Sequence, residues 1–155
     1  MAKIQMKKLE DGKYTGSIVG IKGYTDIEGA RVIVDFMSGE NQDIWENAGC
    51  PAIGMYSLRI KLADREITSN KFANRVIWED KNGDGWTSMD FFTSGLQRQL
   101  GLENETDDVV ILKSAVNVDF YISDYTNPNT GAKSYNVDTR PNKVQVAKES
   151  LGLEF

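Results

Sequence analysis

Residues 80 to 91, DKNGDGWTSMDF, have the acidic spacing of a calcium-binding loop. An EF-hand loop takes oxygen ligands from positions 1, 3 and 5, a glycine at position 6 and a bidentate glutamate at position 12. The first four requirements are met by Asp80, Asn82, Asp84 and Gly85. Position 12, however, is Phe91, which has no side-chain oxygen, and the preceding RVIWE (75 to 79) alternates like a strand rather than a helix. We therefore predict a tight turn here and no metal site.

The residue types that most enzymes use for catalysis are sparse. The 155-residue chain has no histidine and a single cysteine, Cys50, so neither a Ser-His nor a Cys-His nucleophile can form. One cysteine also leaves no internal disulfide and no multi-cysteine zinc site. The 23 acidic residues show no spacing that gathers carboxylates in one cleft, as nucleases and glycosidases require. We predict that the protein is not an enzyme and needs no cofactor.

The residue types that bind single-stranded nucleic acid are better represented in the sequence. Proteins that hold single-stranded nucleic acid combine aromatic rings, which stack on bases, with cations that follow the phosphates. In MYSLRIKLAD (55 to 64) the cations alternate with apolar residues and so point away from the core. In the late strand pair a tyrosine alternates with apolar residues in the same way, and a lysine lies across from the tyrosine at the tip. The predicted nucleic-acid-binding residues are Arg59, Lys61, Trp86, Tyr121, Tyr125 and Lys133.

Each of these side chains also has an ordinary structural interpretation. Aromatic residues dominate the energetics of protein cores, and cations commonly cover a solvated strand face. Outward aromatics and cations on adjacent strands favour binding more than any one of them does. Trp78 shares its strand face with Val76, so we expect Trp78 in the core, whereas Trp86 follows the turn and is the better stacking candidate.

The elements that must position these residues are mostly strands. Alternation of apolar and polar residues predicts strands at 12–24, 30–36, 55–64, 74–80, 114–125 and 132–140. Between the strands at 74–80 and 114–125 the spacing of apolar residues changes to a period of 3.6. One helical face is formed there by Met89, Phe92, Leu96 and Leu100. Thr87 and Asp90 have the spacing of a capping box, and Gly101 stands at the C-terminal cap. This is the one strongly indicated helix.

Three further patterns bear on the fold. Glycines 16, 20 and 23 lie inside the first strand and predict bulges or a bend where the sheet curls. A short helix is predicted between a cap at Asn41 and an end at Gly49. The apolar face of the strand at 114–125 comprises Val116, Val118, Phe120 and Ile122.

The predicted fold class is mainly β, a small antiparallel barrel of the OB-fold type with one helix between the third and fourth core strands. Curling short strands into a barrel removes exposed edges, and a helix can cover an open end. A β-sandwich carrying a helix is the alternative. No repeat or linker divides the chain, so we predict one domain at 1–142, followed by a short C-terminal tail at 143–155.

The succession DGKY, ARVIVDF, IWEDKNGDGWTSMDFFTSGLQRQLGL and VDFYISDYTNPNTGAKSYNVDTRP resembles the phage-encoded single-stranded DNA-binding proteins of the OB-fold type, over most of positions 11 to 141. The likeness lies in the opening strand after a polar lead, the helix ending in Leu-Gly-Leu and the late hairpin with an Asn/Gly-rich tip. The resemblance implies binding of single-stranded DNA with little sequence preference during phage replication or recombination. It also implies a homo-oligomer, with replication or recombination proteins as further partners.

Composition sets outer limits on these expectations. The net charge of −5 argues against a protein that binds nucleic acid with its whole surface, but it leaves room for a local basic groove. No apolar run reaches the roughly 20 residues of a membrane helix, and the start, MAKIQMKKLEDGKY, lacks the apolar region of a secretory signal. We therefore expect a cytoplasmic protein, in the host cell if it is encoded by a phage, with no membrane partner. The alternatives are a virion or scaffold subunit that binds no nucleic acid and a carbohydrate-binding β module.

Overall fold

The computed structural model of the chain describes residues 8 to 140, and antiparallel strands form most of its regular structure. The strands are β1 (Gly12–Ile27), β2 (Ala30–Asp35), β3 (Met55–Lys61), β4 (Glu66–Phe72), β5 (Val76–Glu79), β6 (Gly85–Thr87), β7 (Val118–Thr126) and β8 (Lys133–Asp138). The helices are α1 (Gln42–Asn47), α2 (Ser88–Leu100) and α3 (Asp108–Lys113). The predicted tail at 143–155 lies outside the described residues.

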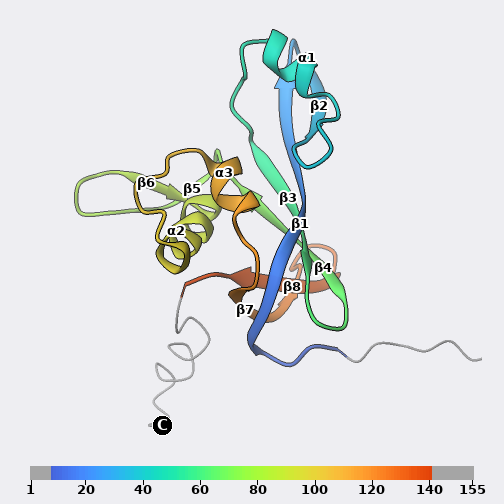
Figure 1. Ribbon diagram of the computed structural model, residues 1–155, viewed down its shortest axis with the longest axis vertical. Coiled ribbons are helices and arrows are strands. Elements are labelled where there is room, and N and C mark those ends of the chain that lie inside the picture. Colours follow the sequence, from blue (N-terminus) through green and yellow to red (C-terminus); the bar gives the residue numbers. More distant parts are fainter. Residues whose placement is uncertain (1–7, 141–155) are drawn as a thin grey trace, which may run out of the picture.

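The long strand β1 organises the main sheet (Figure 1). Its first part, Gly12–Gly16, pairs with β7, and the residues from Ser17 to Tyr24 pair with β3. Its last part, from Lys22 to Ile27, pairs with β2. The strand order is β4-β3-β1-β7-β8, with β2 on β1. The β1–β3 ladder shifts register between Ile18 and Gly20, which confirms the irregularity that the glycines predict.

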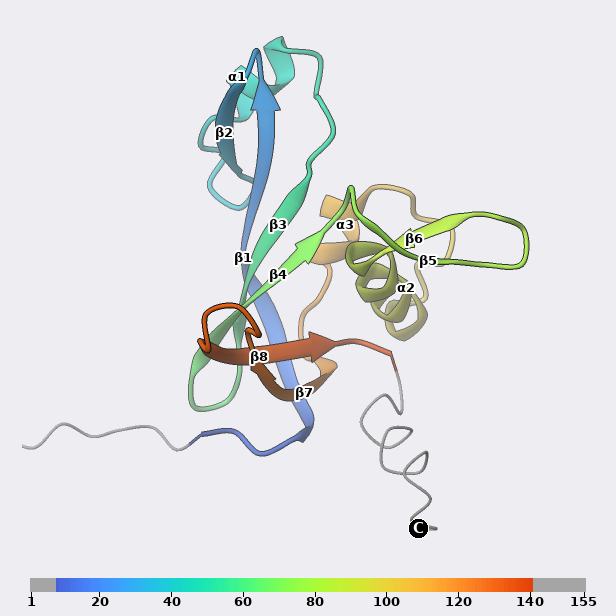
Figure 2. The ribbon, with the colours of Figure 1, turned by 180° about the vertical axis from the view of Figure 1, so that it is seen from behind.

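The two ends of this sheet, β4 and β8, pass close to each other (Figure 2). The Lys71 ammonium of β4 donates a hydrogen bond of 2.5 Å to the Val137 carbonyl oxygen of β8. No backbone ladder joins the two strands within residues 8 to 140, so the sheet is curled but not closed. The mainly β, antiparallel class is confirmed, whereas the predicted OB-type barrel is not, because the described strands do not close into a barrel.

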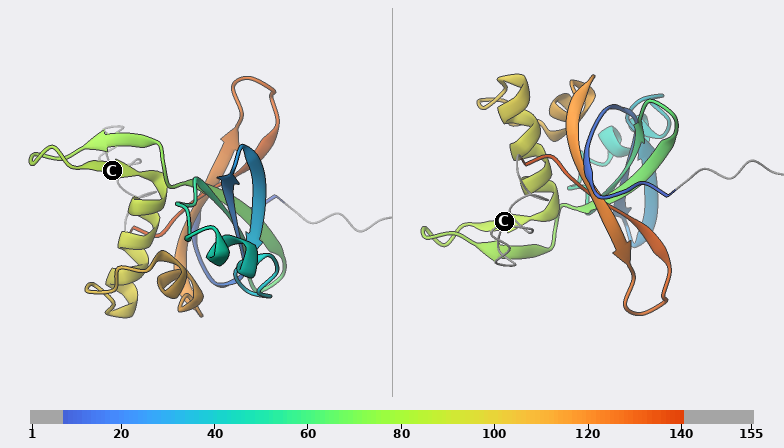
Figure 3. Two further views of the ribbon diagram at one scale, coloured as in Figure 1. Left: turned by 90° about the horizontal axis from the view of Figure 1, so that it is seen from above. Right: turned by 90° about the horizontal axis from the view of Figure 1, so that it is seen from below.

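Helix α2 covers the core, and α2 and α3 lie together on one side of the curled strands (Figure 3). Met89, Phe92 and Leu96 are buried, and the Phe92 ring stacks on Phe120 with 6.2 Å between ring centres. The capping box of Thr87 and Asp90 and the glycine cap at Leu-Gly-Leu form as predicted. No helix in the described part of the chain is long and apolar enough to cross a lipid bilayer.

Several local predictions differ from the structure. Strand β4 and helix α3 were not predicted from the sequence. Val116 is 61% exposed, because the chain turns at Asn117 (φ 54°) and β7 begins only at Val118. Asn41 precedes α1, but it lies in the left-handed region, and its side chain caps no backbone N–H.

The β5–β6 hairpin forms a separate two-stranded sheet, the β5–β6 arm, which projects from the body (Figures 1 and 3). Trp78 lies on this arm rather than in the core and is 52% exposed, so the core prediction for it was wrong. Its ring instead contacts Trp86 and Phe91, with centres 6.1 and 5.9 Å away. Strand alternation alone could not show that the hairpin stands off the body.

Replacement of Gly95 by alanine tests the packing of α2 on β8. Alanine favours a helix by up to about 1 kcal/mol over glycine, but a Cβ at Gly95 would lie 2.6 Å from the carbonyl carbon of Thr139. We expect Gly95→Ala to lower the free energy of unfolding by about 1–3 kcal/mol, as overpacking does, in urea titrations. Ser94→Ala on the same helix is the control and should change it by less than about 0.5 kcal/mol. A stabilised Gly95→Ala protein would contradict the close packing.

Candidate functional site

Strands β1, β3 and β4 present a common outer face on which side chains line up in rows across the strands. The rows, in order, are Tyr24–Met55–Phe72, Lys22–Ser57–Asn70, Gly20–Arg59–Thr68 and Ser17–Lys61–Glu66. The rows between them are buried, as Ile21 and Leu58 show, so the four rows point away from the core. We call this surface the outer face.

Cations occupy three successive rows of the outer face, from the second to the last. Lys22, Arg59 and Lys61 are exposed. The Arg59 Nε lies 3.0 Å from Glu66 Oε1, in an ion pair whose side chains are 55% and 49% exposed. A Cβ at Gly20 would lie 3.0 Å from Arg59 Cβ and 3.4 Å from its Cζ, so a glycine here leaves room for the arginine to cross β1. The charge of Arg59 is therefore held on the surface, where an anion can reach it.

Two hollows follow one another along the outer face. The larger, of about 550 Å³, is lined by Tyr24, Phe72, Arg31 and Arg75 among others. The Arg75 guanidinium carbon lies 4.3 Å from the centre of the Phe72 ring. The second hollow, of about 360 Å³, is lined by Lys22, Ser57, Arg59 and Thr68, together with Asp35. Because the two hollows lie over consecutive rows of side chains, they form one path. Aromatic rings line one end of this path, and cations line the part that follows.

The structure places the predicted site residues in three separate regions. Arg59 and Lys61 lie together on the outer face. Tyr121, Tyr125 and Lys133 belong to the β7–β8 hairpin, where Tyr125 is 46% exposed and Lys133 is exposed. The half-buried Tyr121 lies across from a lysine of β1 and an aspartate of β8.

The β7–β8 hairpin reaches the turn between β3 and β4, at the Lys61 end of the outer face. Hydrogen bonding to Asp64 and, to a smaller extent, to the Tyr135 hydroxyl of β8 raises the pKa of Arg65 in that turn. The hairpin tyrosines therefore lie beyond one end of the rows, and the ring-lined hollow lies at the other end.

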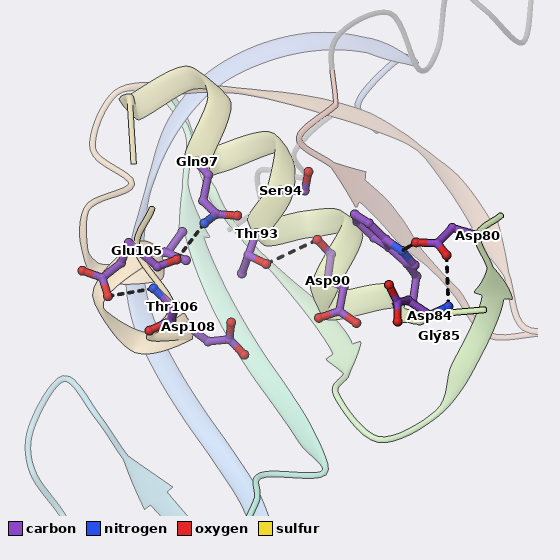
Figure 4. Close-up of a pocket in the computed structure, with 12 residues that line it drawn as sticks. Asp80, Asp84, Gly85, Asp90, Thr93, Ser94, Gln97, Glu105, Thr106 and Asp108 are labelled. Atoms are coloured by element: carbon purple, nitrogen blue, oxygen red, sulfur yellow. Dashed lines mark hydrogen bonds between the residues drawn. The ribbon is translucent and has the colours of Figure 1, made fainter. Parts of the chain in front are cut away.

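Trp86, the third region, lines an acidic hollow instead; the carboxylates of this hollow are labelled in Figure 4. This hollow, of about 470 Å³, is lined by Trp86 and by Asp80, Asp84, Asp90, Glu105 and Asp108. The Trp86 ring packs on Phe91 with centres 5.1 Å apart, and its Nε1 donates to Asp80 Oδ2 at 3.1 Å. Because carboxylates repel phosphates, Trp86 is poorly placed to stack on a nucleic-acid base.

Asp108 is the most perturbed carboxyl group of the acidic hollow. Burial, and next the charges of Asp90 and Asp107, raise its pKa to about 6. Asp90 is occupied as a helix cap, since its Oδ2 accepts a 2.8 Å hydrogen bond from the Thr87 backbone N–H. No group of three or more potential ligands in residues 8 to 140 is arranged to hold a metal ion.

The segment DKNGDG forms the tight turn that the sequence predicts. Asp80 Oδ1 accepts hydrogen bonds from the backbone N–H groups of Asn82 and Asp84, at 2.9 and 3.0 Å. The hydrogen bond from Trp86, followed by those from the backbone, lowers the pKa of Asp80. This carboxylate therefore stabilises the turn at the tip of the β5–β6 arm.

Sequence reasoning missed the ring-lined hollow. Lys22 and Tyr24 follow the same alternation that identified Arg59 and Lys61, so that signal was present. Phe72 was missed with its whole strand, because β4 (EITSNKF) points Ser69 and Lys71 inward and so lacks an apolar face.

No family model, curated protein or solved structure matches the chain. The function must therefore be inferred from the surface itself.

Calcium titration tests the turn. Because Asp80 already accepts hydrogen bonds on both oxygens and Phe91 stands at the bidentate position, we expect isothermal titration with calcium to give no heat of binding at millimolar concentration. Heat that saturates at micromolar calcium, and that Asp84→Asn abolishes, would contradict this.

The pH dependence of stability tests Asp108. Its pKa of about 6 in the folded state lies above its ordinary value of 3.8, so the folded protein binds the extra proton between these values and loses stability as the pH rises through this window. At pH 7 we expect Asp108→Asn to be more stable than the wild type by about 1 kcal/mol, a value reduced for partial exposure. The difference should disappear below about pH 4.

Urea unfolding at several pH values measures the difference in stability between Asp108→Asn and the wild type. Glu103→Gln, at an exposed position, is the control and should be as stable as the wild type at each pH. An Asp108→Asn protein that is less stable than the wild type at pH 7 would show instead that the carboxylate makes a net favourable contact.

Proposed function

We propose that the chain is an OB-type barrel that binds single-stranded DNA with little sequence preference, during phage replication or recombination. The strand order supports the barrel. In an OB-fold a long first strand is shared by both halves of a five-stranded Greek-key barrel that is partly open. Here β1 joins β4-β3 to β7-β8, α2 lies between β4 and β7, and Lys71 links the two end strands.

The observation that carries the binding proposal is the path of rings and cations along the outer face. Tyr24 and Phe72 can stack on bases, and stacking tolerates every base because each has a π-face. Lys22 and Arg59 lie in the next rows, where the phosphates of the same strand would pass. The small residues between them, Gly20 and Ser57, keep the surface open to a flexible polymer.

The charge distribution also supports this assignment. The chain is acidic overall, with a net charge of −5, but five of its 23 acidic residues are gathered around the hollow beside α2. The exposed cations around the two outer-face hollows, Lys22, Arg31, Arg59 and Arg75, outnumber the carboxylates that line them, Asp26 and Asp35. A polyanion is therefore attracted to one face and repelled by another, which orients the approach.

Binding is tested with a labelled oligo-dT of about 30 nucleotides, longer than the roughly 4–16 nucleotides that one OB-fold covers. Fluorescence anisotropy at several salt concentrations gives both affinity and salt slope. Tyr24→Ala should weaken binding by about 1–3 kcal/mol with the slope unchanged. Lys22→Ala and Arg59→Ala should each lower the slope of log affinity against log salt by about 0.7.

Matched variants separate these effects from a loss of structure. Tyr24→Phe keeps the ring and should bind like the wild type, and Lys81→Ala removes an exposed cation at the tip of the β5–β6 arm and should leave the slope unchanged. Tyr125→Ala measures whether the β7–β8 hairpin joins the path. If the folded wild type shows no salt-sensitive binding at micromolar concentration, the proposal fails, and the virion-subunit or carbohydrate-binding interpretation takes its place.

A further inference from the structure

The free edge of β5 exposes an unusual run of apolar residues. Within residues 8 to 140, β5 pairs only with β6, so its second edge has no strand beside it. Val76, Ile77 and Trp78 are 55%, 59% and 52% exposed. Proteins normally protect such an edge with lysine, proline or a covering element. Here the centre of the edge has none of these, although β5 has only four residues and its ladder with β6 shifts register between Val76 and Trp78.

The β5–β6 arm holds this edge in a fixed conformation. Trp78 packs against both Trp86 and Phe91. The hydrogen bonds of Asp80 to the turn and to Trp86 fix the end of the hairpin. An ordered strand loses less conformational entropy on pairing than a flexible one, so the arm is prepared to accept a further strand.

The charges that flank the apolar run identify the strand that fits. The segment reads Arg-Val-Ile-Trp-Glu from Arg75 to Glu79. If two copies pair antiparallel about Ile77, Arg75 of each copy lies across from Glu79 of the partner subunit, and Val76 lies across from Trp78 of the partner subunit. Both charged residues are exposed, and neither is in an ion pair within the described part of the chain. The Arg75 guanidinium lies over the Phe72 ring, so pairing with Glu79 of the partner subunit requires it to turn away from that ring. The segment is thus complementary to itself.

We propose that β5 pairs with β5 of a second copy across a two-fold axis, which joins two β5–β6 arms in one four-stranded sheet. Such an isologous contact closes on itself, so it gives a dimer and not a filament. A contact of two short strands lies at the small end of interface sizes, so the dimer is expected to form in the micromolar range. The arm projects away from the strands that carry the outer face (Figure 1). Because Arg75 also lines the larger outer-face hollow, dimer formation is measured in the absence of nucleic acid.

Sedimentation of the full chain tests the proposal, from about 1 to about 200 μM, a range that brackets micromolar dissociation constants. The wild type should pass from monomer to dimer. Ile77→Lys sets two lysines opposite each other at the two-fold axis and should keep the protein monomeric at all concentrations. Circular dichroism and the melting temperature should not change, because the Ile77 side chain is exposed. Val116→Lys, at a 61% exposed position outside the arm, is the matched control and should dimerise like the wild type.

A charge exchange tests the antiparallel register itself. Arg75→Glu alone and Glu79→Arg alone each set like charges opposite each other twice and should weaken the dimer at least tenfold. The double variant Arg75→Glu/Glu79→Arg restores opposite charges and should recover most of the wild-type dissociation constant. A wild type that stays monomeric over the whole range overturns the proposal. A dimer that neither Ile77→Lys nor the single charge variants weaken also overturns it, because another surface would then join the copies.

Discussion

The backbone ladder along β1 is the interaction on which the other parts of the structure depend. A strand of 16 residues pairs with three partners in succession, and from Lys22 to Tyr24 it is paired on both sides. Because side chains alternate between the two faces of a strand, this single ladder decides which residues of β3 and β7 point inward. The register shift near Gly20 bends the strand without breaking it. The outer face, the core under α2 and the position of the hairpins all follow from that one bent strand.

The junction between β4 and β8 shows how an incompletely closed sheet is held together. Lys71 occupies a position in β4 where an apolar residue would be expected, and it is buried beside the Phe92 ring, 5.2 Å from its centre. Burial lowers the pKa of Lys71 to about 8, so the folded chain bears a desolvation penalty at neutral pH that diminishes as the pH rises toward the ordinary lysine value of 10.5. The hydrogen bond to the Val137 carbonyl offsets part of that penalty and links two strand ends that no ladder joins. One polar side chain thus links the two end strands in place of a backbone ladder.

The same residue explains where prediction from sequence stopped. Tyr56, Leu58 and Ile60 alternate cleanly with polar residues, so the inward face of β3 and the outward Arg59 could be predicted. In β4 the buried positions include Ser69 and Lys71, whose environment depends on strands far along the chain, and no local pattern indicates it. Helix α3 was missed because DVVILK is too short and too uniformly apolar to show a period. The outer face was therefore half predicted: its cations on β3 could be found from alternation, but Phe72 could not.

An acidic protein can hold a polyanion because binding is decided by local groups rather than by the total charge. At physiological salt, charges separated by more than about 8 Å are largely screened from each other. Carboxylates that lie beyond that distance from a bound strand therefore weaken its attraction to the cations only slightly. The competitors on the outer face itself are Asp26 and Asp35, which line its hollows, and Glu66, which already pairs with Arg59. An exposed ion pair of this kind contributes at most about 1 kcal/mol, so a phosphate can displace Glu66 at small cost. Glu66 thereby keeps the Arg59 guanidinium in place on the outer face and still leaves it available to an anion.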